Sequence, residues 1–555
     1  MSSERLIYLP LGGAGEIGMN AYVYGYGKPG KERLILVDLG VAFPDMDTTP
    51  GVDLILPDIT WLAERRDQLE AIFVTHAHED HIGAVAHSYD RLGAPVYARA
   101  FTANLARRKM AEFGHPEKAV KTVSPWPEVT QVGPFSVGFV PTSHSIPESS
   151  GLVIDTPAGR VVHSGDFKID TDPVVGEPFD RSLWASLAEG GVKALICDST
   201  NVFSLHPGRS ESSVGVPITE LVARSKGMFV CTTFASNVAR LKTLAEAGVR
   251  AGRSVCLMGR AMQRMVEAAR ETGVLTGFPK TVSPEEAATI PRESLMLIVT
   301  GSQGERRAAS AQLANGKYNG LTMKEGDTFL FSSKTIPGNE RGVIRIINQF
   351  SELGVDVIEG DDHYHVSGHA NQPDLIEVHR LLQPQILIPM HGEHRHLRAH
   401  VKLASANGIK GVLAVNGMMM DLSGNTPKVA EFVDTGRTYL DGSVKVGAMD
   451  GVVRDRIRMA LNGHVMVNVL LDETDDPLGD PWVETMGLAE TGRSHAPLID
   501  VMEEDLAQFM GRAGAATLTD DDKLEEGLRR VVRQTAQTEI GKRPEVTVVI
   551  SRLTA

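Results

Sequence analysis

Short apolar runs alternate with polar turns through the first third of the chain, in a pattern typical of small buried strands. Residues 71–75 form one such run, apolar and partly β-branched, which predicts a buried strand. Residues 59–69 are amphipathic and predict a helix before this strand, and residues 82–86 predict the start of a helix after it. The polar segment between them therefore lies where a strand stops and the chain turns.

Three histidines and a carboxylate fill that turn, at His76, His78, Asp80 and His81. On an extended segment His76 and His78 point the same way, because side chains alternate with period two. Asp80 and His81 come next on the turn and can face a second position. Neutral imidazole and carboxylate are ligands that zinc accepts at about 2.0–2.2 Å. A single His-x-His is more often a polar surface turn, but the whole group directly after a strand predicts a metal site.

Two later strand ends carry the same kind of residue. His144 follows the apolar run 137–140, and Asp166 follows the run 159–163. Alone, each is more simply explained as a polar residue of a surface loop. In this order after the His-x-His-x-Asp-His motif, however, they resemble the third and fourth metal motifs of the metallo-β-lactamase superfamily. That resemblance implies that Asp166 bridges two metal ions.

The pattern of apolar and polar positions changes at about residue 209. Strand and helix patterns alternate from there to about residue 355, which predicts a parallel α/β domain. Its loops at residues 300–305 and 332–340 are rich in Gly, Ser and Thr, and such loops offer backbone N–H groups and hydroxyls to anions. The strand pattern of the first domain then resumes to about residue 450. The first domain is therefore predicted to be interrupted by an insert, with the metal site in the cleft between the two.

Three further motifs narrow the resemblance to the β-CASP nucleases. Asp198 in Cys-Asp-Ser-Thr-Asn, His369 in His-Val-Ser-Gly-His-Ala and His391 in Pro-Met-His-Gly-Glu resemble motifs A, B and C of that family. The loops at residues 300–305 and 336–339 look like those of bacterial ribonuclease J enzymes. The resemblance covers essentially the whole chain, most loosely in the tail.

The fold class predicted from these features is α/β: a metallo-β-lactamase αββα sandwich interrupted by an inserted parallel α/β β-CASP domain, plus a small C-terminal α/β domain. We expect residues 1–208 and 356–450 to form the two parts of the sandwich, and residues 209–355 to form the insert. Residues 451–555 are expected to hold a charged linker and the C-terminal domain, with a helix at residues 523–537 and a last strand at residues 545–551.

The resemblance also implies roles for single residues. The implied zinc ligands are His76, His78 and His144 for one ion, Asp80, His81 and His391 for the other, and Asp166 as the bridge. The implied catalytic residues are His369 as the partner of the leaving ribose 3′-oxygen, Asp80 as a group that orients the attacking water, and Asp198 as the support of a histidine or metal ligand. The expected 5′-phosphate pocket consists of His365, Val366, Ser367, Gly368, His369, Ser302 and Ser332. A calcium ion is implied near Gly51, Asp53 and Asp441.

Composition sets limits on these expectations. The net charge of −14 argues against a protein that coats nucleic acid non-specifically, although it allows a local basic channel. Cys197, Cys231 and Cys256 lie in or beside apolar runs and are expected to be buried reduced thiols, which suits a cytosol. No apolar run approaches the length of a membrane span, so a soluble cytoplasmic protein is expected.

One motif points to a different class of function. Residues 13–18 match the Gly-x-Gly-x-x-Gly dinucleotide pattern, and Asp38 lies about 20 residues farther on, as that pattern requires. A dinucleotide loop must open a helix, however, whereas residues 20–24 and 33–38 both predict strands. The glycines are therefore expected to make a tight turn near the metal cleft.

The favoured function is a zinc-dependent ribonuclease that degrades RNA from 5′-monophosphate ends towards the 3′ end and also cleaves internally. A small-molecule metallo-hydrolase is the first alternative, but it needs neither an inserted domain nor His369. A non-catalytic RNA-binding protein is the second, and the intact ligand set argues against it. DNA as the substrate is the third, and the 2′-hydroxyl would discriminate. The family further implies a homodimer or homotetramer and partners in RNA degradation.

Overall fold

The structure is a computed structural model, which describes residues 4–336 and 338–553. The chain divides into two compact units. The first runs to residue 43 and continues from 54 to 438, and the second consists of residues 44–53 and the chain from 439 onward. The predicted insert and most of the predicted sandwich lie in the first unit, but residues 44–53 and 439–450, which were assigned to the sandwich, belong to the second.

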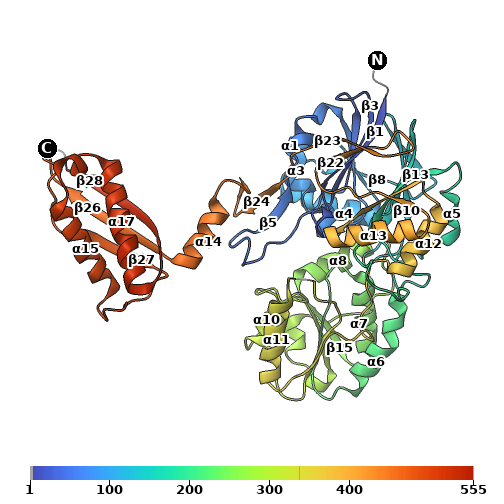
Figure 1. Cartoon of the computed structure of the whole chain (residues 1–555). Coiled ribbons are helices and arrows are strands. Elements are labelled where there is room, and N and C mark those ends of the chain that lie inside the picture. The colour runs from blue at the N-terminus through green and yellow to red at the C-terminus, as the bar shows by residue number, and fades with distance from the viewer. Residues whose placement is uncertain (1–3, 337, 554–555) are drawn as a thin grey trace. The chain divides into compact units, whose positions relative to one another are not determined.

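Two mixed sheets form the sandwich of the first unit (Figure 1). The strands of the first sheet, in spatial order, are β23 (Lys428–Phe432), β22 (Met418–Asp421), β1 (Arg5–Gly12), β3 (Ala21–Gly27), β4 (Arg33–Val37), β6 (Leu69–Phe73), β7 (Val96–Ala98) and β8 (Val120–Thr122). Those of the second are β21 (Lys410–Gly411), β19 (Ile386–Met390), β13 (Val192–Asp198), β12 (Gly159–His163), β11 (Ser150–Thr156), β10 (Phe135–Pro141) and β9 (Val129–Val132).

Helices cover the outer face of each sheet, which completes the predicted αββα order. Tyr8, Phe73, Phe139 and Ile196 belong to one buried cluster that fills the space between the sheets. The other face of the first sheet is covered by α1 (Thr60–Ala63), α3 (Val85–Leu92) and α4 (Ala100–Glu112). The other face of the second is covered by α5 (Arg181–Ser186), α12 (Gln372–Leu382) and α13 (His394–Ala406).

The inserted domain is a five-stranded parallel sheet, as predicted, drawn in green and yellow in Figure 1. Its strands, in spatial order, are β15 (Ser254–Met258), β16 (Leu295–Val299), β14 (Phe229–Thr232), β17 (Thr328–Phe331) and β18 (Asp356–Ile358). Its main helices are α6 (Gly215–Arg224), α7 (Val238–Arg250), α8 (Arg260–Glu271), α10 (Ala309–Ala314) and α11 (Glu340–Glu352). Ala77, Phe101 and Ile146 of the sandwich share a buried cluster with α6 and α7, so the two domains pack through a common apolar core.

The tail contains more regular structure than its acidic sequence indicated. The sheet β27 (Trp482–Met486), β26 (His464–Leu471) and β28 (Glu545–Arg552) packs against α15 (Leu498–Arg512) and α17 (Asp521–Ile540), and α14 (Val452–Asn462) precedes it. The predicted helix and last strand are present within α17 and β28. We did not predict β26, β27 or α15. In β26 the buried Val465, Val467 and Val469 alternate with more exposed positions that include the apolar Met466 and Leu470, which obscures the polar–apolar alternation of a strand.

Local structure around the histidine motif differs from the expectation in two places. The predicted helix over 59–69 is only the single turn α1, followed by a 3₁₀ turn at Arg66–Gln68, because strand β6 already begins at Leu69. The polar segment that carries His76 to His81 is also not a simple turn, because part of it is helical. Residues Glu79–Ile82 form a one-turn helix, α2, which places Asp80 and His81 on helical backbone.

Candidate metal centre

Strand direction brings the predicted ligands of the second sheet to one edge. Strands β10, β12, β13 and β19 all run the same way, because β11 is antiparallel to both β10 and β12 while β12, β13 and β19 are parallel. The residues at or shortly after their ends therefore meet at that edge. These residues are His144, Asp166, Asp198 and His391. Such a meeting is what a shared site built from distant parts of a sequence requires.

The first ligand group joins the histidine motif to this edge. His78 Nδ1 lies 3.1 Å from His76 Nε2 and 3.1 Å from His144 Nε2. Two nitrogens bound tetrahedrally to one zinc ion would stand about 3.3 Å apart, given zinc–nitrogen bonds of about 2.0–2.1 Å. His76, His78 and His144 together with Asp166 present ligand atoms that all lie within 4.8 Å of one another. The spacing fits the predicted first metal.

The second group shares Asp166 with the first. It consists of Asp80, His81, Asp166 and His391. The Asp166 Oδ2 atom lies 3.2 Å from His81 Nε2 and 3.8 Å from His144 Nε2, so one carboxylate oxygen faces both groups. The other oxygen, Oδ1, is buried and lies 3.3 Å from His391 Nδ1, and it makes no hydrogen bond among the described residues. A buried carboxylate oxygen left in this way fits a cation as its partner.

Charge at the centre also favours a cation. Burial by itself lowers the pKa of His391, but Asp166, Asp198 and Asp80 outweigh burial and raise it to about 10. The pKa of His81 is raised in the same manner: burial opposes the rise, and Asp166 and Asp80 cause it. The three carboxylates thus favour positive charge in this buried centre. Bound metal ions supply that charge while the histidine ligands stay unprotonated.

Asp38 holds His81 from behind. The His81 Nδ1–H donates to Asp38 Oδ2 at 2.8 Å, so Nε2 is turned toward Asp166. The backbone N–H of Thr75 donates to the other carboxylate oxygen of Asp38 at 2.8 Å. Such a carboxylate fixes the tautomer and orientation of a ligating histidine. We examined Asp38 only as part of a dinucleotide pattern and missed this role; its position directly after strand β4, like Asp166 after β12, was the available signal.

Asp38→Asn is expected to weaken metal binding about 10–100-fold, because the amide carries no negative charge and its single acceptor oxygen cannot serve both the Thr75 N–H and His81 Nδ1–H as the two carboxylate oxygens do. Competition with a chelator of known affinity would measure the change. Asp47→Asn, on the exposed loop at residues 45–49, is the control and should leave the affinity unchanged. Equal metal affinity in Asp38→Asn and the wild type would contradict this role.

Close backbone contacts surround Asp80, and glycines make them possible. A Cβ atom at Gly40 would overlap the backbone carbonyl of Asp80, and one at Gly18 would lie 3.5 Å from the Asp80 Cβ. The Asp80 carbonyl also accepts from Asn20 Nδ2 at 3.0 Å. Residues 12–20 therefore line the metal loop, which confirms the tight turn expected of the glycine-rich segment and its place near the metal ligands.

Gly40→Ala is expected to reduce the free energy of unfolding by about 1–3 kcal/mol, since backbone must move to admit the methyl group. Because the atom displaced belongs to Asp80, metal content should fall as well. Gly215→Ala is the matched control: its Cβ would meet only the Thr243 methyl at 3.7 Å, and we expect a change below about 1 kcal/mol. Denaturant unfolding and metal analysis of both variants test this, and equal stability would refute it.

Two of the predicted catalytic residues, His369 and Asp198, form a pair in the structure. His369 Nδ1 donates to Asp198 Oδ2 at 2.7 Å, and the Thr200 hydroxyl donates to Asp198 Oδ1 at 2.8 Å. Burial lowers the pKa of His369, but the charge and hydrogen bond of Asp198 outweigh it and the pKa is raised. The segment is tied to the first ligand group, because His144 Nδ1–H donates to the Gly368 carbonyl at 2.5 Å.

Known proteins with similar sequences cover this whole arrangement. Residues 15–195 match the metallo-beta-lactamase superfamily, and residues 226–350 match the family described as the beta-CASP domain of ribonuclease J. Residues 355–414 match an RNA specificity domain of Zn-dependent metallo-hydrolases, and residues 451–553 match the ribonuclease J C-terminal domain. The chain is 41% identical to ribonuclease J of Sinorhizobium meliloti over 99% of its own length and 98% of the relative's. The chain belongs to the ribonuclease J family.

One further relative supports the family, and one solved structure supports the fold. Ribonuclease J of Mycolicibacterium smegmatis is 36% identical, over 94% of this chain and 93% of the relative. A solved crystal structure of a protein of unknown function from Enterococcus faecalis V583 aligns with a TM-score of 0.50 over 75% of this chain and all of that chain. At 17% identity, it shows likeness of fold alone. The predicted family, and with it the fold class, is confirmed.

The structure brings together only part of the phosphate pocket that the ribonuclease J resemblance implied. The Ser332 hydroxyl and His365 Nδ1 both lie near the buried Arg240 guanidinium, at 2.9 and 3.4 Å from Nη1. Ser367 Oγ instead accepts from Asn201 at 2.8 Å. Val366 is buried in the apolar core. Ser302 is buried, and among the described residues no hydrogen bond joins it to residues 365–369.

Arg240 is a residue of this segment that sequence reasoning missed. It is fully buried, pairs with Glu211 at 2.6 Å, and donates to the Ser332 and Tyr364 carbonyls. Its place in the motif Asn-Val-Ala-Arg, at the start of helix α7, was the signal available. Pro337, in the predicted Ile-Pro-Gly-Asn loop, lies outside the described residues.

The predicted calcium ligands occupy the second unit. Asp53 Oδ2 accepts from the Gly442 N–H at 2.8 Å, and Asp441 Oδ2 pairs with the Arg456 guanidinium at 2.7 Å. A Cβ at Gly51 would lie 3.1 Å from the same guanidinium. Arg456 thus neutralises one of the two carboxylates that a calcium ion would need. We derive no role for calcium, and its site stays a prediction.

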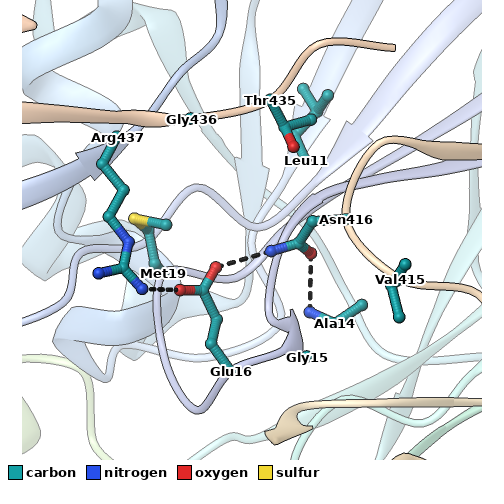
Figure 2. A pocket seen from close by; sticks show the side chains of 10 residues that line it. All are labelled: Leu11, Ala14, Gly15, Glu16, Met19, Val415, Asn416, Thr435, Gly436 and Arg437. Atoms are coloured by element: carbon teal, nitrogen blue, oxygen red, sulfur yellow. Dashed lines mark hydrogen bonds and ion pairs between the residues drawn. The ribbon is translucent and has the colours of Figure 1, made fainter. Parts of the chain in front are cut away.

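A pocket of about 330 Å³ lies beside the glycine-rich segment (Figure 2). In Figure 2 the Glu16 carboxylate joins Arg437 and Asn416, and Asn416 accepts from the Ala14 N–H. These contacts fix the loop at the end of which the backbone N–H of Asn20 donates to the Asp80 carbonyl at 2.9 Å. None of the predicted ligand, catalytic or phosphate-binding residues lines this pocket.

Proposed function

We propose that this chain is a zinc-dependent ribonuclease that hydrolyses RNA phosphodiester bonds, removing nucleotides from 5′-monophosphate ends towards the 3′ end and also cleaving internally, in RNA maturation and decay. One observation carries the proposal. Residues between positions 76 and 391 converge into two metal-ligand groups that share Asp166, and the Asp198–His369 pair stands beside them. Every named relative with which the chain was compared above is a ribonuclease J.

The centre would hold two zinc ions. His76, His78 and His144 would bind one, Asp80, His81 and His391 the other, and Asp166 both. When bound, such a pair supplies an activated water near neutral pH and positive charge for the phosphoryl oxygens. The protein's own part is to fix these ligands: Asp38 orients His81, the Gly368 carbonyl orients His144, and Asn20 holds the backbone of Asp80. We propose that the Asp80 carboxylate, in addition, orients the attacking water.

His369 would handle the proton at the leaving group. Its Nδ1–H is committed to Asp198, which leaves Nε2 as the ring atom that can give a proton to the departing ribose 3′-oxygen. Its raised pKa keeps the imidazolium available near neutral pH. Asp198 thus acts through His369 and not on RNA itself.

The 5′-phosphate would bind at His365, Ser367, Gly368 and the loops of Ser302 and Ser332. Burial, and after it the positive charges of Arg240, Lys334 and Lys168, lower the pKa of His365 to about 3. Arg240 and Lys168 also pair with Glu211 and Asp170, so we expect Lys334, which forms no ion pair among the described residues, to attract the phosphate monoester. A triphosphate is larger and carries more charge, so a closed pocket would exclude it.

End-labelled RNA tests both the class of reaction and its polarity. With zinc-loaded protein and a 5′-monophosphate substrate labelled at its 5′ end, we expect mononucleotide as the first labelled product. With the 3′ label, we expect progressive shortening, and with chelated protein no cleavage. Cleavage that persists after chelation, or DNA degraded as fast as RNA of the same sequence, would overturn the proposal.

The nature of the 5′ end should change the rate. RNA with a 5′-monophosphate should be degraded at least about tenfold faster than the same RNA with a 5′-triphosphate, the ratio expected if the pocket distinguishes the ends by about 1.4 kcal/mol. Initial rates on the two substrates measure this. A circular RNA, which has no end and can only be cleaved internally, serves as the control. Equal rates on both linear substrates would count against the pocket.

The predicted homodimer or homotetramer and the predicted partners in RNA degradation stay predictions.

Among the described residues, no helix combines the length and apolar character that crossing a membrane requires.

A further inference from the structure

A second kind of ligand cluster lies on the outer face of the second sheet. Side chains of β13 alternate, so that Ile196 belongs to the core between the sheets while Cys197 belongs to the cluster under the helices α12 and α13. Asp198, the next residue, turns back to the metal centre. Cys197 is therefore separated from that centre by the sheet itself.

Two histidines reach Cys197 from those helices. His379 comes from α12 and His400 from α13, and their Nε2 atoms lie 3.0 Å apart with the rings nearly parallel. The Sγ of Cys197 and one nitrogen of each ring all lie within 4.8 Å of one another. All three residues are at most 1% exposed. The surroundings are mainly apolar, including Val378, Leu382 and Ala404, and Ser199 and Ser164 are the polar side chains beside the three groups.

The hydrogen bonds of the cluster prepare it for a cation. The Ser199 hydroxyl donates to the Cys197 carbonyl at 3.3 Å, which leaves its oxygen to accept from His400 Nδ1–H at 2.9 Å. His400 Nε2 then carries a lone pair directed at His379. A ligating histidine is oriented in this way, by a partner on its other nitrogen. His379 Nδ1 has no hydrogen-bond partner among the described residues, and burial lowers the pKa of His379 to about 4, so its ring is neutral.

We propose that Cys197, His379 and His400 form a third metal site, which binds a borderline-soft ion of the Zn²⁺ class between β13, α12 and α13. One thiolate and two imidazoles are a ligand set that zinc accepts and that Mg²⁺ and Ca²⁺ do not. Binding removes the thiol proton of Cys197, which is released to solvent, and forms the sulfur–metal bond. Because the site is closed, the ion would enter while the domain folds, and it would tie the two helices to the sheet.

Cobalt provides a probe that sees this site alone. The catalytic centre offers only nitrogen and oxygen ligands, so a thiolate-to-cobalt charge-transfer band in the near-ultraviolet spectrum can arise only from a cysteine. Full-length protein produced in cobalt-supplemented medium should show this band. It should hold one more equivalent of cobalt per chain than the variant Cys197→Ala, in which the band is lost. Cys231→Ala and Cys256→Ala are matched controls, since neither buried thiol belongs to a ligand group among the described residues, and both should keep the band.

A second variant keeps the test decisive if Cys197→Ala does not fold. His379→Gln removes one nitrogen ligand but leaves the thiol, and it should shift or abolish the band while the far-ultraviolet circular dichroism stays unchanged. Three outcomes overturn the proposal: no charge-transfer band in folded cobalt-loaded protein, a band that survives in Cys197→Ala, or equal cobalt content in wild type and both variants. In each of these cases the two rings share only a hydrogen bond.

Discussion

Replacing both His76 and His78 by alanine is expected to reduce RNA cleavage by at least about 10³-fold, because the metal ions contribute several kcal/mol to the transition state and each 1.36 kcal/mol is a factor of ten in rate. These two side chains supply half of the first ligand group, and His144 and Asp166 cannot hold an ion firmly alone. Metal content should fall by at least one equivalent per chain, measured by elemental analysis beside initial cleavage rates.

The fold should survive this change, since the sandwich core lies between the sheets and not at the strand ends. The matched control is His394→Ala, an exposed histidine three residues after the ligand His391, which should keep both metal and activity. Full activity in metal-depleted His76→Ala/His78→Ala protein would show that the chemistry takes place elsewhere.

Replacing His369 by glutamine is expected to slow cleavage by about 10²–10⁴-fold, the usual contribution of a positioned acid or base, while metal content stays at the wild-type level. The reason is geometric. His369 makes its short hydrogen bond to Asp198, whereas the ligand groups can be completed without it. Single-turnover rates measured at saturating protein separate this loss from any loss of RNA binding.

His363→Gln provides the control from the same loop, because that ring is exposed and, among the described residues, forms an ion pair with Asp361 alone. It should cleave at the wild-type rate. If His369→Gln instead lost metal and activity in proportion, the residue would be a ligand and not a proton donor. A variant that cleaved normally would remove His369 from the mechanism altogether.

Most of the centre could be predicted because its ligands follow a simple rule. Each lies directly after an apolar run, and parallel strands deliver such positions to one edge. The motif His76–His81, with Asp166 and His391, therefore predicted both where the strands end and that their ends form a metal site. The resemblance to a known family added Asp198 and His369 as catalytic residues, but that these two form a pair is shown only by the structure.

The supporting residues could not be predicted in the same way. Asp38 lies in a motif that first points to a nucleotide, and its partner is 43 positions away in the sequence. Arg240 is a buried cation, and a charged residue at the start of a helix is ordinarily taken as exposed. The cluster of Cys197, His379 and His400 forms only because two helices pack against one strand, so no local sequence pattern predicts it.

Crystals of the zinc-loaded full-length chain, with anomalous scattering recorded at the zinc absorption edge, would test the central claim most directly. We predict two strong neighbouring peaks, one within about 2.0–2.2 Å of nitrogens of His76, His78 and His144 and the other at that distance from Asp80, His81 and His391, with Asp166 touching both. A single peak, or a peak that includes His76 but leaves His391 without a metal, would contradict the account.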